Sequence, residues 1–212
     1  LLENKERGKI DINQIIGKNK ALISMFAGSR KSEVTVLMPI LLDFIKLMNE
    51  KYSDMTYVFH STKQYSELIQ SFISKTSLSN CEIVSDEKIK SHILQKSIFA
   101  VAKSGTVSLE ISNAKIPSII LYKMNFLNFF IVKSLVKTKY ANIINFAANE
   151  EVIPELLQSN CNSENIFKNV SSFLEDPNKI KDQIKKVQSV LDTLKINGSS
   201  AELASLSLNK FL

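Results

Sequence analysis

Two short turn sequences contain residue types that can bind phosphate. The first is Gly28-Ser29-Arg30, which follows an apolar segment and precedes a helical pattern. Glycine allows a tight turn and a close approach of the backbone to a ligand, and the N–H groups at a helix start can hold an oxyanion. The guanidinium of Arg30 is a two-pronged donor that suits phosphate. The same residues also suit a plain turn with a solvated arginine, and spacing alone leaves both interpretations open.

The second turn is Ser104-Gly105-Thr106, which opens a helical pattern directly after another apolar segment. Glu110 follows Thr106 by four positions, so it lies on the same helix face one turn further along. A phosphate at the turn would leave a ribose near Glu110, whose carboxylate can accept hydrogen bonds from ribose hydroxyls. A capped helix with a surface glutamate is the alternative. Neither turn has the spacing of a Walker A motif or of G-x-G-x-x-G, so ATP and NAD have no support.

Metal and cofactor chemistry have no signature in the sequence. Cys81 and Cys161 stand far apart, and so do the two histidines, His60 and His92, without partners at ligand spacing. We therefore predict no metal site and no cofactor.

The net charge of +6 comes almost entirely from lysine, because Arg7 and Arg30 are the two arginines of the chain. In such a lysine-rich chain, a remaining arginine can mark a position that needs a planar fork. The lysines are dispersed and no nucleic-acid-binding motif occurs, so we predict no nucleic-acid partner.

Segments of strand and helix length alternate along the chain, which is typical of β-α-β units with a parallel sheet. Both turns follow predicted strands, and ligands bind at the carboxyl ends of such strands. The pattern predicts an α/β fold, a Rossmann-like doubly wound parallel sheet with a helical C-terminal tail, and irregular chain over 142–149. Strands are expected at 21–27, 55–59, 81–84, 97–102 and 117–122, and helices at 34–48, 65–73, 86–94, 107–114, 126–136, 154–158, 163–174, 179–194 and 201–208.

Four segments together resemble the lipid-A-disaccharide synthase family of GT-B glycosyltransferases. Gly28-Ser29-Arg30 with Glu33-Val34 resembles its PGSR-x-x-EV turn, and Ser104-Gly105-Thr106 through Glu110 resembles its SGT-x-x-LE motif. Residues 133–140 (KSLVKTKY) resemble its R-LVK-x-x-Y segment, and Asn145 with 151–158 (EVIPELLQ) resembles its N-LL-x(4)-VPELLQ stretch. The order and spacing agree over residues 22–174.

The resemblance implies a function for the chain as the carboxy-terminal part of such an enzyme. The family joins UDP-2,3-diacylglucosamine to 2,3-diacylglucosamine 1-phosphate, releases UDP and so takes part in lipid A biosynthesis. Its two Rossmann-like domains face a cleft, and the carboxy-terminal one holds UDP. The implied division is a leader over 1–19, a UDP-sugar-binding domain over 20–176 and a tail over 177–212.

Carried over by motif, the residues have the following implied roles. Gly28, Ser29 and Arg30 face the donor phosphates, and Arg30 stabilises the departing UDP without a metal ion. The Ser104-Gly105-Thr106 turn supplies N–H and hydroxyl donors, and Glu110 binds the ribose. Asn145 belongs to the donor-binding set without an assigned role.

The chain departs from the family pattern at several positions. Ala27 and Ile144 replace prolines, Lys103 stands where the family tends to have a small or apolar residue, and Lys123 replaces arginine. Residues 85–88, near the expected uracil, lack the usual glycine-containing loop.

The general base is expected in an amino-terminal acceptor domain that this sequence lacks, so the chain alone is expected to bind the donor and turn over poorly. The alternatives are a non-catalytic nucleotide-binding remnant or subunit, and another UDP-sugar GT-B enzyme such as the peptidoglycan N-acetylglucosaminyltransferase.

Two segments suggest contacts beyond the substrates. The aromatic segment 126–136 lies among lysines, so it suits either an anionic membrane surface or a core helix with a basic edge. Leucines in the tail favour a homodimer through residues after 197. The sequence has no signal peptide and no membrane span, so we expect a cytoplasmic location, peripheral on the inner face of the inner membrane.

Overall fold

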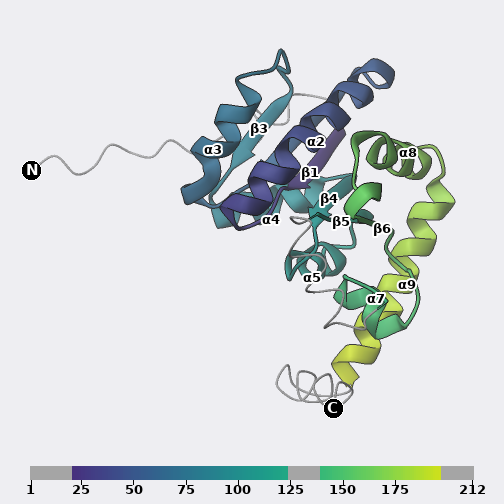
Figure 1. Ribbon diagram of the computed structural model, residues 1–212. Helices are drawn as coiled ribbons and strands as arrows, with labels where there is room; N and C mark the ends of the chain where they lie inside the picture. The colour runs from purple at the N-terminus through teal and green to yellow at the C-terminus, as the bar shows by residue number, and fades with distance from the viewer. Residues whose placement is uncertain (1–20, 124–138, 197–212) are drawn as a thin grey trace, which may run out of the picture.

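The computed structural model describes residues 21–123 and 139–196, which form one six-stranded sheet with helices on both faces (Figure 1). The strand order is β3-β2-β1-β4-β5-β6, and every neighbouring pair is parallel. This is the order of the Rossmann fold, which confirms the predicted fold class. The strands are β1 (Ala21–Phe26), β2 (Met55–His60), β3 (Cys81–Val84), β4 (Phe99–Lys103), β5 (Ser118–Tyr122) and β6 (Glu155–Leu157).

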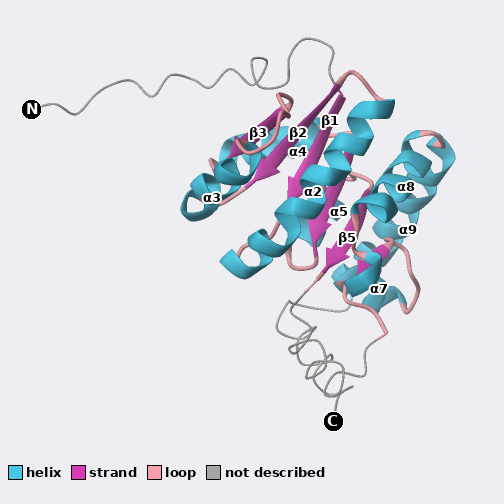
Figure 2. Ribbon diagram, turned by 45° about the horizontal axis from the view of Figure 1, so that its top comes forward, coloured by secondary structure: helices cyan, strands magenta, loops and turns pink. Residues whose placement is uncertain are grey.

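The helices divide between the two faces of the sheet. One face is covered by α2 (Lys31–Lys51), α3 (Lys63–Ile73) and α8 (Ser163–Leu174), and Figure 2 shows α2 lying across it. The other face is covered by α4 (Glu87–Lys96), α5 (Val107–Asn113), α7 (Ile143–Ala148) and α9 (Pro177–Ile196). A short 3-10 helix, η1 (Gln158–Asn160), links β6 to α8.

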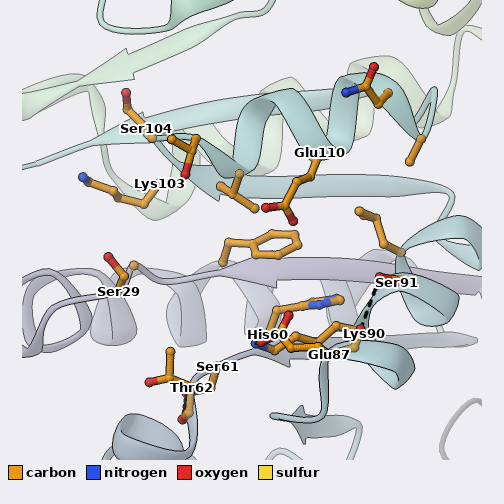
Figure 3. A pocket seen from close by; sticks show the side chains of 18 of the residues that line it. Ser29, His60, Ser61, Thr62, Glu87, Lys90, Ser91, Lys103, Ser104 and Glu110 are labelled. Atoms are coloured by element: carbon orange, nitrogen blue, oxygen red, sulfur yellow. Dashed lines mark hydrogen bonds and ion pairs between the residues drawn. The ribbon is translucent and has the colours of Figure 1, made fainter. Parts of the chain in front are cut away.

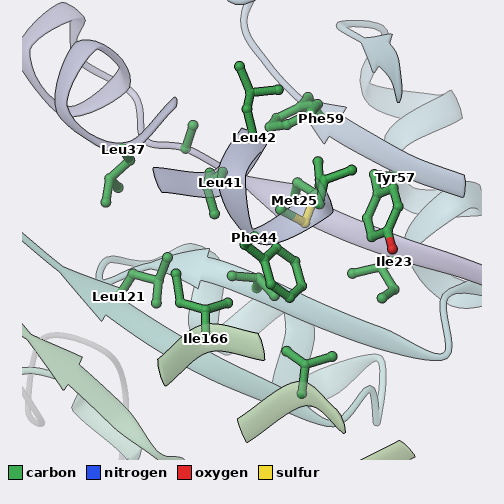
Figure 4. Close-up of a cluster of buried hydrophobic side chains, with 14 of the residues drawn as sticks. Ile23, Met25, Leu37, Leu41, Leu42, Phe44, Tyr57, Phe59, Leu121 and Ile166 are labelled. Carbon is green, nitrogen blue, oxygen red and sulfur yellow. The ribbon is translucent and has the colours of Figure 1, made fainter. Parts of the chain in front are cut away.

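The central strands are apolar on both sides because helices cover both faces of the sheet. In β1, Ile23 and Met25 belong to the core under α2, while Leu22 packs on the opposite face. The helical stripe predicted for residues 34–48 is confirmed, since Leu37, Leu41 and the other apolar residues of α2 are buried. Figure 4 shows this cluster between α2 and the sheet.

Two local predictions were wrong. Residues 154–158 contain the strand β6, where we predicted a helix, because Leu156 and its neighbours pair with β5 at the edge of the sheet. Residues 142–149 contain α7, where we predicted irregular chain. Asn142 caps α7 by accepting hydrogen bonds from the N–H groups of Ile144 and Asn145, and Asn149 ends it in the left-handed conformation with φ 50°.

No helix within the described residues is long and apolar enough to cross a membrane. The predicted helices at 126–136 and 201–208 lie outside the described residues, as do the leader 1–19 and the segment expected to form a dimer. The division of the chain at residues 19 and 176 stays a prediction, although Val187 and Leu191 of α9 pack into the core of the α5 face.

Candidate functional site

The two predicted turns meet at the point where the strand order reverses. β1 and β4 are neighbours in the sheet, but α2 and α5, the helices that follow them, lie on opposite faces. Ligands of open α/β sheets bind in the crevice at such a switch point. The structure therefore brings the Gly28 turn and the Ser104 turn together at the carboxyl ends of the central strands β1 and β4, as the sequence predicted.

A pocket of about 790 Å³ opens between these turns and α4, which lies within the range of about 300–1,000 Å³ that is usual for ligand sites. In Figure 3, Ser29, Lys103 and Ser104 lie toward one end and Lys90 and Ser91 toward the other, with Glu110 between them. The predicted residues that line the pocket are Gly28, Ser29, Ser104, Gly105, Thr106 and Glu110. The other lining residues are Phe26, His60, Ser61, Thr62, Glu87, Lys90, Ser91, Leu94, Gln95, Lys103, Val107, Asn113 and Ala114.

The first turn is closed by Glu33 and requires glycine at position 28. Gly28 has φ +117°, and a Cβ atom there would lie 2.6 Å from Cβ of Glu33. The N–H of Ser29 donates to Glu33 Oε2 at 2.9 Å. Residues with a side chain rarely adopt this backbone conformation. Both the positive φ and the close contact with Glu33 therefore exclude any residue larger than glycine.

Lys103 connects the two turns through an ion pair. Its Nζ lies 2.8 Å from Glu33 Oε1, while the guanidinium of Arg30 is 3.9 Å from the same oxygen. Burial opposes ionisation of Glu33, but the hydrogen bonds from Lys103 and Ser29 and the nearby positive charges outweigh it, so the pKa of Glu33 is lowered. The sequence singled out Lys103 only as a departure from the family pattern.

In the second turn, the donors of Ser104 are already used within the protein. Its N–H donates to the carbonyl of Leu121 at 2.8 Å, and its hydroxyl donates to the carbonyl of Ala141 at 2.6 Å. Both donors of Ser104 are thus used within the protein, and its role toward a ligand stays a prediction. Within the part of the chain that the structure describes, the N–H groups of Gly105 and Thr106 have no acceptor. The carboxylate of Glu110 points into the pocket (Figure 3).

Arg30 and Asn145 do not line the pocket. The Arg30 side chain is 79% exposed at the start of α2. Asn145 is fully buried. Its Nδ2 donates to the Ile153 carbonyl and to Glu155 Oε1, and its Oδ1 accepts from the N–H groups of Val152 and Ile153. All the hydrogen-bonding positions of the Asn145 amide are thus used within the protein, and none is left for the nucleotide-sugar donor. The side chain holds the backbone of Val152 and Ile153 in place.

A neutral histidine in the pocket wall was missed by the sequence analysis. The hydroxyl of Ser24 lies 2.8 Å from His60 Nε2 and 2.7 Å from the hydroxyl of Ser97, which also reaches the Ile93 carbonyl at 3.0 Å. The His60 ring stacks on Phe26 with centroids 4.3 Å apart. The sequence could have indicated His60 through its position directly after the predicted strand 55–59, because ligand-binding residues gather at the carboxyl ends of strands.

The stability of the protein is expected to fall in acid because of His60. Burial, and secondarily the charge of Lys90, lower the pKa of His60 from 6.5 to about 3. Below pH 6.5 the His60 side chain binds a proton in the unfolded chain but stays neutral in the folded protein. The free energy of unfolding therefore decreases as the pH falls from 6.5 toward 3. We expect His60→Gln to remove a slope of about 1.4 kcal/mol per pH unit from the free energy of unfolding between pH 6 and 4. Denaturant titrations at several pH values measure it, and His92→Gln on the exposed side of α4 should keep the wild-type slope.

Among residues 21–123 and 139–196, no group of three His, Cys, Asp or Glu side chains could hold a metal ion. The absence of a metal ion from the reaction stays a prediction.

The chain is similar in sequence to known lipid-A-disaccharide synthases. A family model described as Lipid-A-disaccharide synthetase matches residues 2–208. Lipid-A-disaccharide synthase of Sulfurihydrogenibium sp. (strain YO3AOP1) is 31% identical over 97% of this chain and 55% of its own length. That of Rickettsia prowazekii (strain Madrid E) is 32% identical over 84% of this chain and 47% of its own length. The chain thus spans about half the length of the curated relatives it matches.

Solved structures share the fold at low identity. The C-terminal domain of a glycosyl transferase group 1 family protein from Francisella tularensis has a TM-score of 0.55 and 13% identity, covering 82% of this chain and 85% of that domain. UDP-GlcNAc 2-epimerase from Neisseria meningitidis has a TM-score of 0.53 and 16% identity, covering 88% of this chain and 48% of that protein. The fold is therefore that of a glycosyltransferase C-terminal domain, and the family match shows that the chain belongs to the lipid-A-disaccharide synthetase family.

Proposed function

We propose that this chain is the donor-binding part of a lipid-A-disaccharide synthase, which transfers 2,3-diacylglucosamine from its UDP derivative to 2,3-diacylglucosamine 1-phosphate and releases UDP. The observation that carries the proposal is the pocket between the two turns, with Glu110 directed into it. The names and coverage of the relatives support the choice of reaction.

The donor is proposed to lie along the length of the pocket. Its diphosphate occupies the end near Ser29 and Ser104 (Figure 3). The N–H groups of Gly105 and Thr106, which follow Ser104 and also line the pocket, are available to it. The carboxylate of Glu110 accepts hydrogen bonds from the ribose hydroxyls, and the base lies toward Lys90 on α4. Arg30, the last residue of the first turn, supplies a positive charge from outside the pocket lining.

Transfer is proposed to be a displacement at the anomeric carbon. The acceptor hydroxyl oxygen forms a bond to that carbon, the bond from the carbon to the UDP oxygen breaks, and the hydroxyl proton passes to a general base. Negative charge develops on the departing UDP, and fixed N–H groups and cations stabilise it. The general base and the acceptor site are assigned to the part of the longer relatives that this chain does not match.

Membrane contact is part of the proposal, because both sugar substrates carry acyl chains. We place the enzyme at the cytoplasmic face of the inner membrane, with contact through residues 126–136 and dimerisation through the tail. Both contacts stay predictions, since these segments lie outside the described residues.

Titration calorimetry with UDP and ADP tests the proposed function. UDP is expected to bind more tightly than ADP, and Glu110→Ala is expected to weaken UDP binding about tenfold, as expected for loss of hydrogen bonds to a charged group. Arg30→Ala should weaken it less, because its side chain stands largely in solvent. The matched control is Glu67→Ala on the exposed side of α3, which should bind like the wild type. Equal binding of UDP and ADP, or no binding at all, would overturn the proposed function.

A further inference from the structure

The pocket contains a cation that neither the family motifs nor the proposed roles include. Lys103 is the last residue of β4 and directly precedes the Ser104-Gly105-Thr106 turn. It lines the pocket, its side chain is 21% exposed, and its Nζ lies 2.8 Å from Glu33 Oε1. The ammonium group is therefore held between the two turns, at the end of the pocket where Ser29 and Ser104 also lie (Figure 3).

The other cations near the site are placed less well for a diphosphate. Arg30 does not line the pocket, and its side chain is 79% exposed. Lys90 lines the opposite end, where it pairs with Glu87 at 2.8 Å. Lys103 thus combines a position beside both turns with shielding from solvent, and charges interact more strongly where water is partly excluded.

We propose that Lys103 directly contacts the diphosphate of the bound nucleotide and stabilises its charge as it departs. This inference rests on the proposed function, because it names a further residue at the same site. Lysine offers three donors on a compact charge that can turn between partners. Glu33 holds the ammonium group in place, and a bound diphosphate becomes its second, more highly charged partner.

Glu33 provides a way to separate contact from support. Its Oε2 accepts the N–H of Ser29 at 2.9 Å while its Oε1 pairs with Lys103. If Lys103 only braced the two turns through Glu33, neutralising either partner would have the same effect on ligand binding. If Lys103 contacts the diphosphate, removing the charge of Glu33 leaves the cation free for the ligand.

The experiment titrates the chain and its variants with UDP and with uridine, which lacks the phosphates. Lys103→Met is expected to weaken UDP binding at least tenfold and to leave uridine binding within twofold of the wild type. Lys103→Arg should stay within about threefold for both ligands. Glu33→Gln, whose amide oxygen can still accept the N–H of Ser29, is expected to lose less UDP affinity than Lys103→Met. Lys46→Met is the matched control, since Lys46 forms a 2.7 Å pair with Asp43 on the exposed side of α2.

The outcomes distinguish this inference from the proposed function. If wild-type chain binds UDP and Lys103→Met binds it equally well, the role of Lys103 is wrong while the proposed function stands. If Lys103→Met and Glu33→Gln lose UDP affinity to the same extent, or if Lys103→Met loses uridine affinity in proportion, Lys103 supports the turns and does not contact the diphosphate. If the wild-type chain fails to bind UDP, the proposed function itself fails.

Discussion

Asn145→Ala is expected to lower the free energy of unfolding by about 3–4 kcal/mol, because it removes four hydrogen bonds and leaves the buried N–H and carbonyl of Ile153 without partners. The N–H of Ile153 loses its acceptor at 2.8 Å and the carbonyl of Ile153 loses its donor at 2.6 Å. The N–H of Val152 loses its 2.9 Å bond to Asn145 and keeps the carbonyl of Glu150 at 3.0 Å. Asn145 is fully buried, so water does not replace these bonds without rearrangement of the surrounding chain.

Urea unfolding followed by circular dichroism measures this loss. The control is Asn169→Ala in α8, where the side chain is half-buried and its Nδ2 donates to the carbonyl of Asn165. We expect the control to lose less than about 1 kcal/mol, the usual value for one intramolecular hydrogen bond. Similar losses in the two variants would contradict the structural role of Asn145.

The same network links Asn145 to the second turn of the pocket. Glu155 accepts a hydrogen bond from Asn145 and also from the N–H groups of Ala141 and Asn142, at 2.7 and 2.9 Å. The carbonyl of Ala141 in turn accepts a hydrogen bond from the hydroxyl of Ser104. Asn145 is therefore joined through Glu155 to the segment that accepts the hydrogen bond of Ser104.

Gly28→Ala is expected to destabilise the protein by about 2–4 kcal/mol, the combined effect of a strained backbone and overpacking. The added Cβ would meet both Cβ and Oε2 of Glu33 at 2.6 Å, and φ of +117° disfavours any side chain. Moving Glu33 away would break its bond to the N–H of Ser29 and disturb its pair with Lys103. Affinity for UDP should fall with the loss of the turn.

The second glycine of the pocket offers the matched control for stability. A Cβ added at Gly105 meets nothing within 4 Å, and this residue lies outside the strained φ range. Thermal unfolding should therefore show a large decrease in stability for Gly28→Ala and a change within about 0.5–1 kcal/mol for Gly105→Ala. A loss for Gly28→Ala as small as that expected for Gly105→Ala would show that the first turn does not depend on glycine.

Most helices and strands of this fold can be predicted from the sequence, because the spacing of their apolar residues repeats within each helix or strand. The stripe of apolar residues in α2 and the apolar runs of β1, β2 and β4 repeat within one helix or strand, and each predicts its element without knowledge of the rest. Two elements, β6 and α7, are too short to show such a repeat. β6 has three residues whose pairing with β5 depends on a distant segment, and α7 has six residues that depend on the caps Asn142 and Asn149.

The candidate site divides in the same way. The sequence by itself determined the α/β class, the two glycine-containing turns after β1 and β4 and the position of Glu110 one helical turn beyond Thr106, because each depends on neighbouring residues. Only the tertiary structure decided the strand order that brings the turns together, the outward direction of Arg30, the burial of Asn145 and the pairing of Lys103 with Glu33. These features depend on contacts between segments far apart in the chain, and no local pattern records which side chain will face which partner once the sheet has formed.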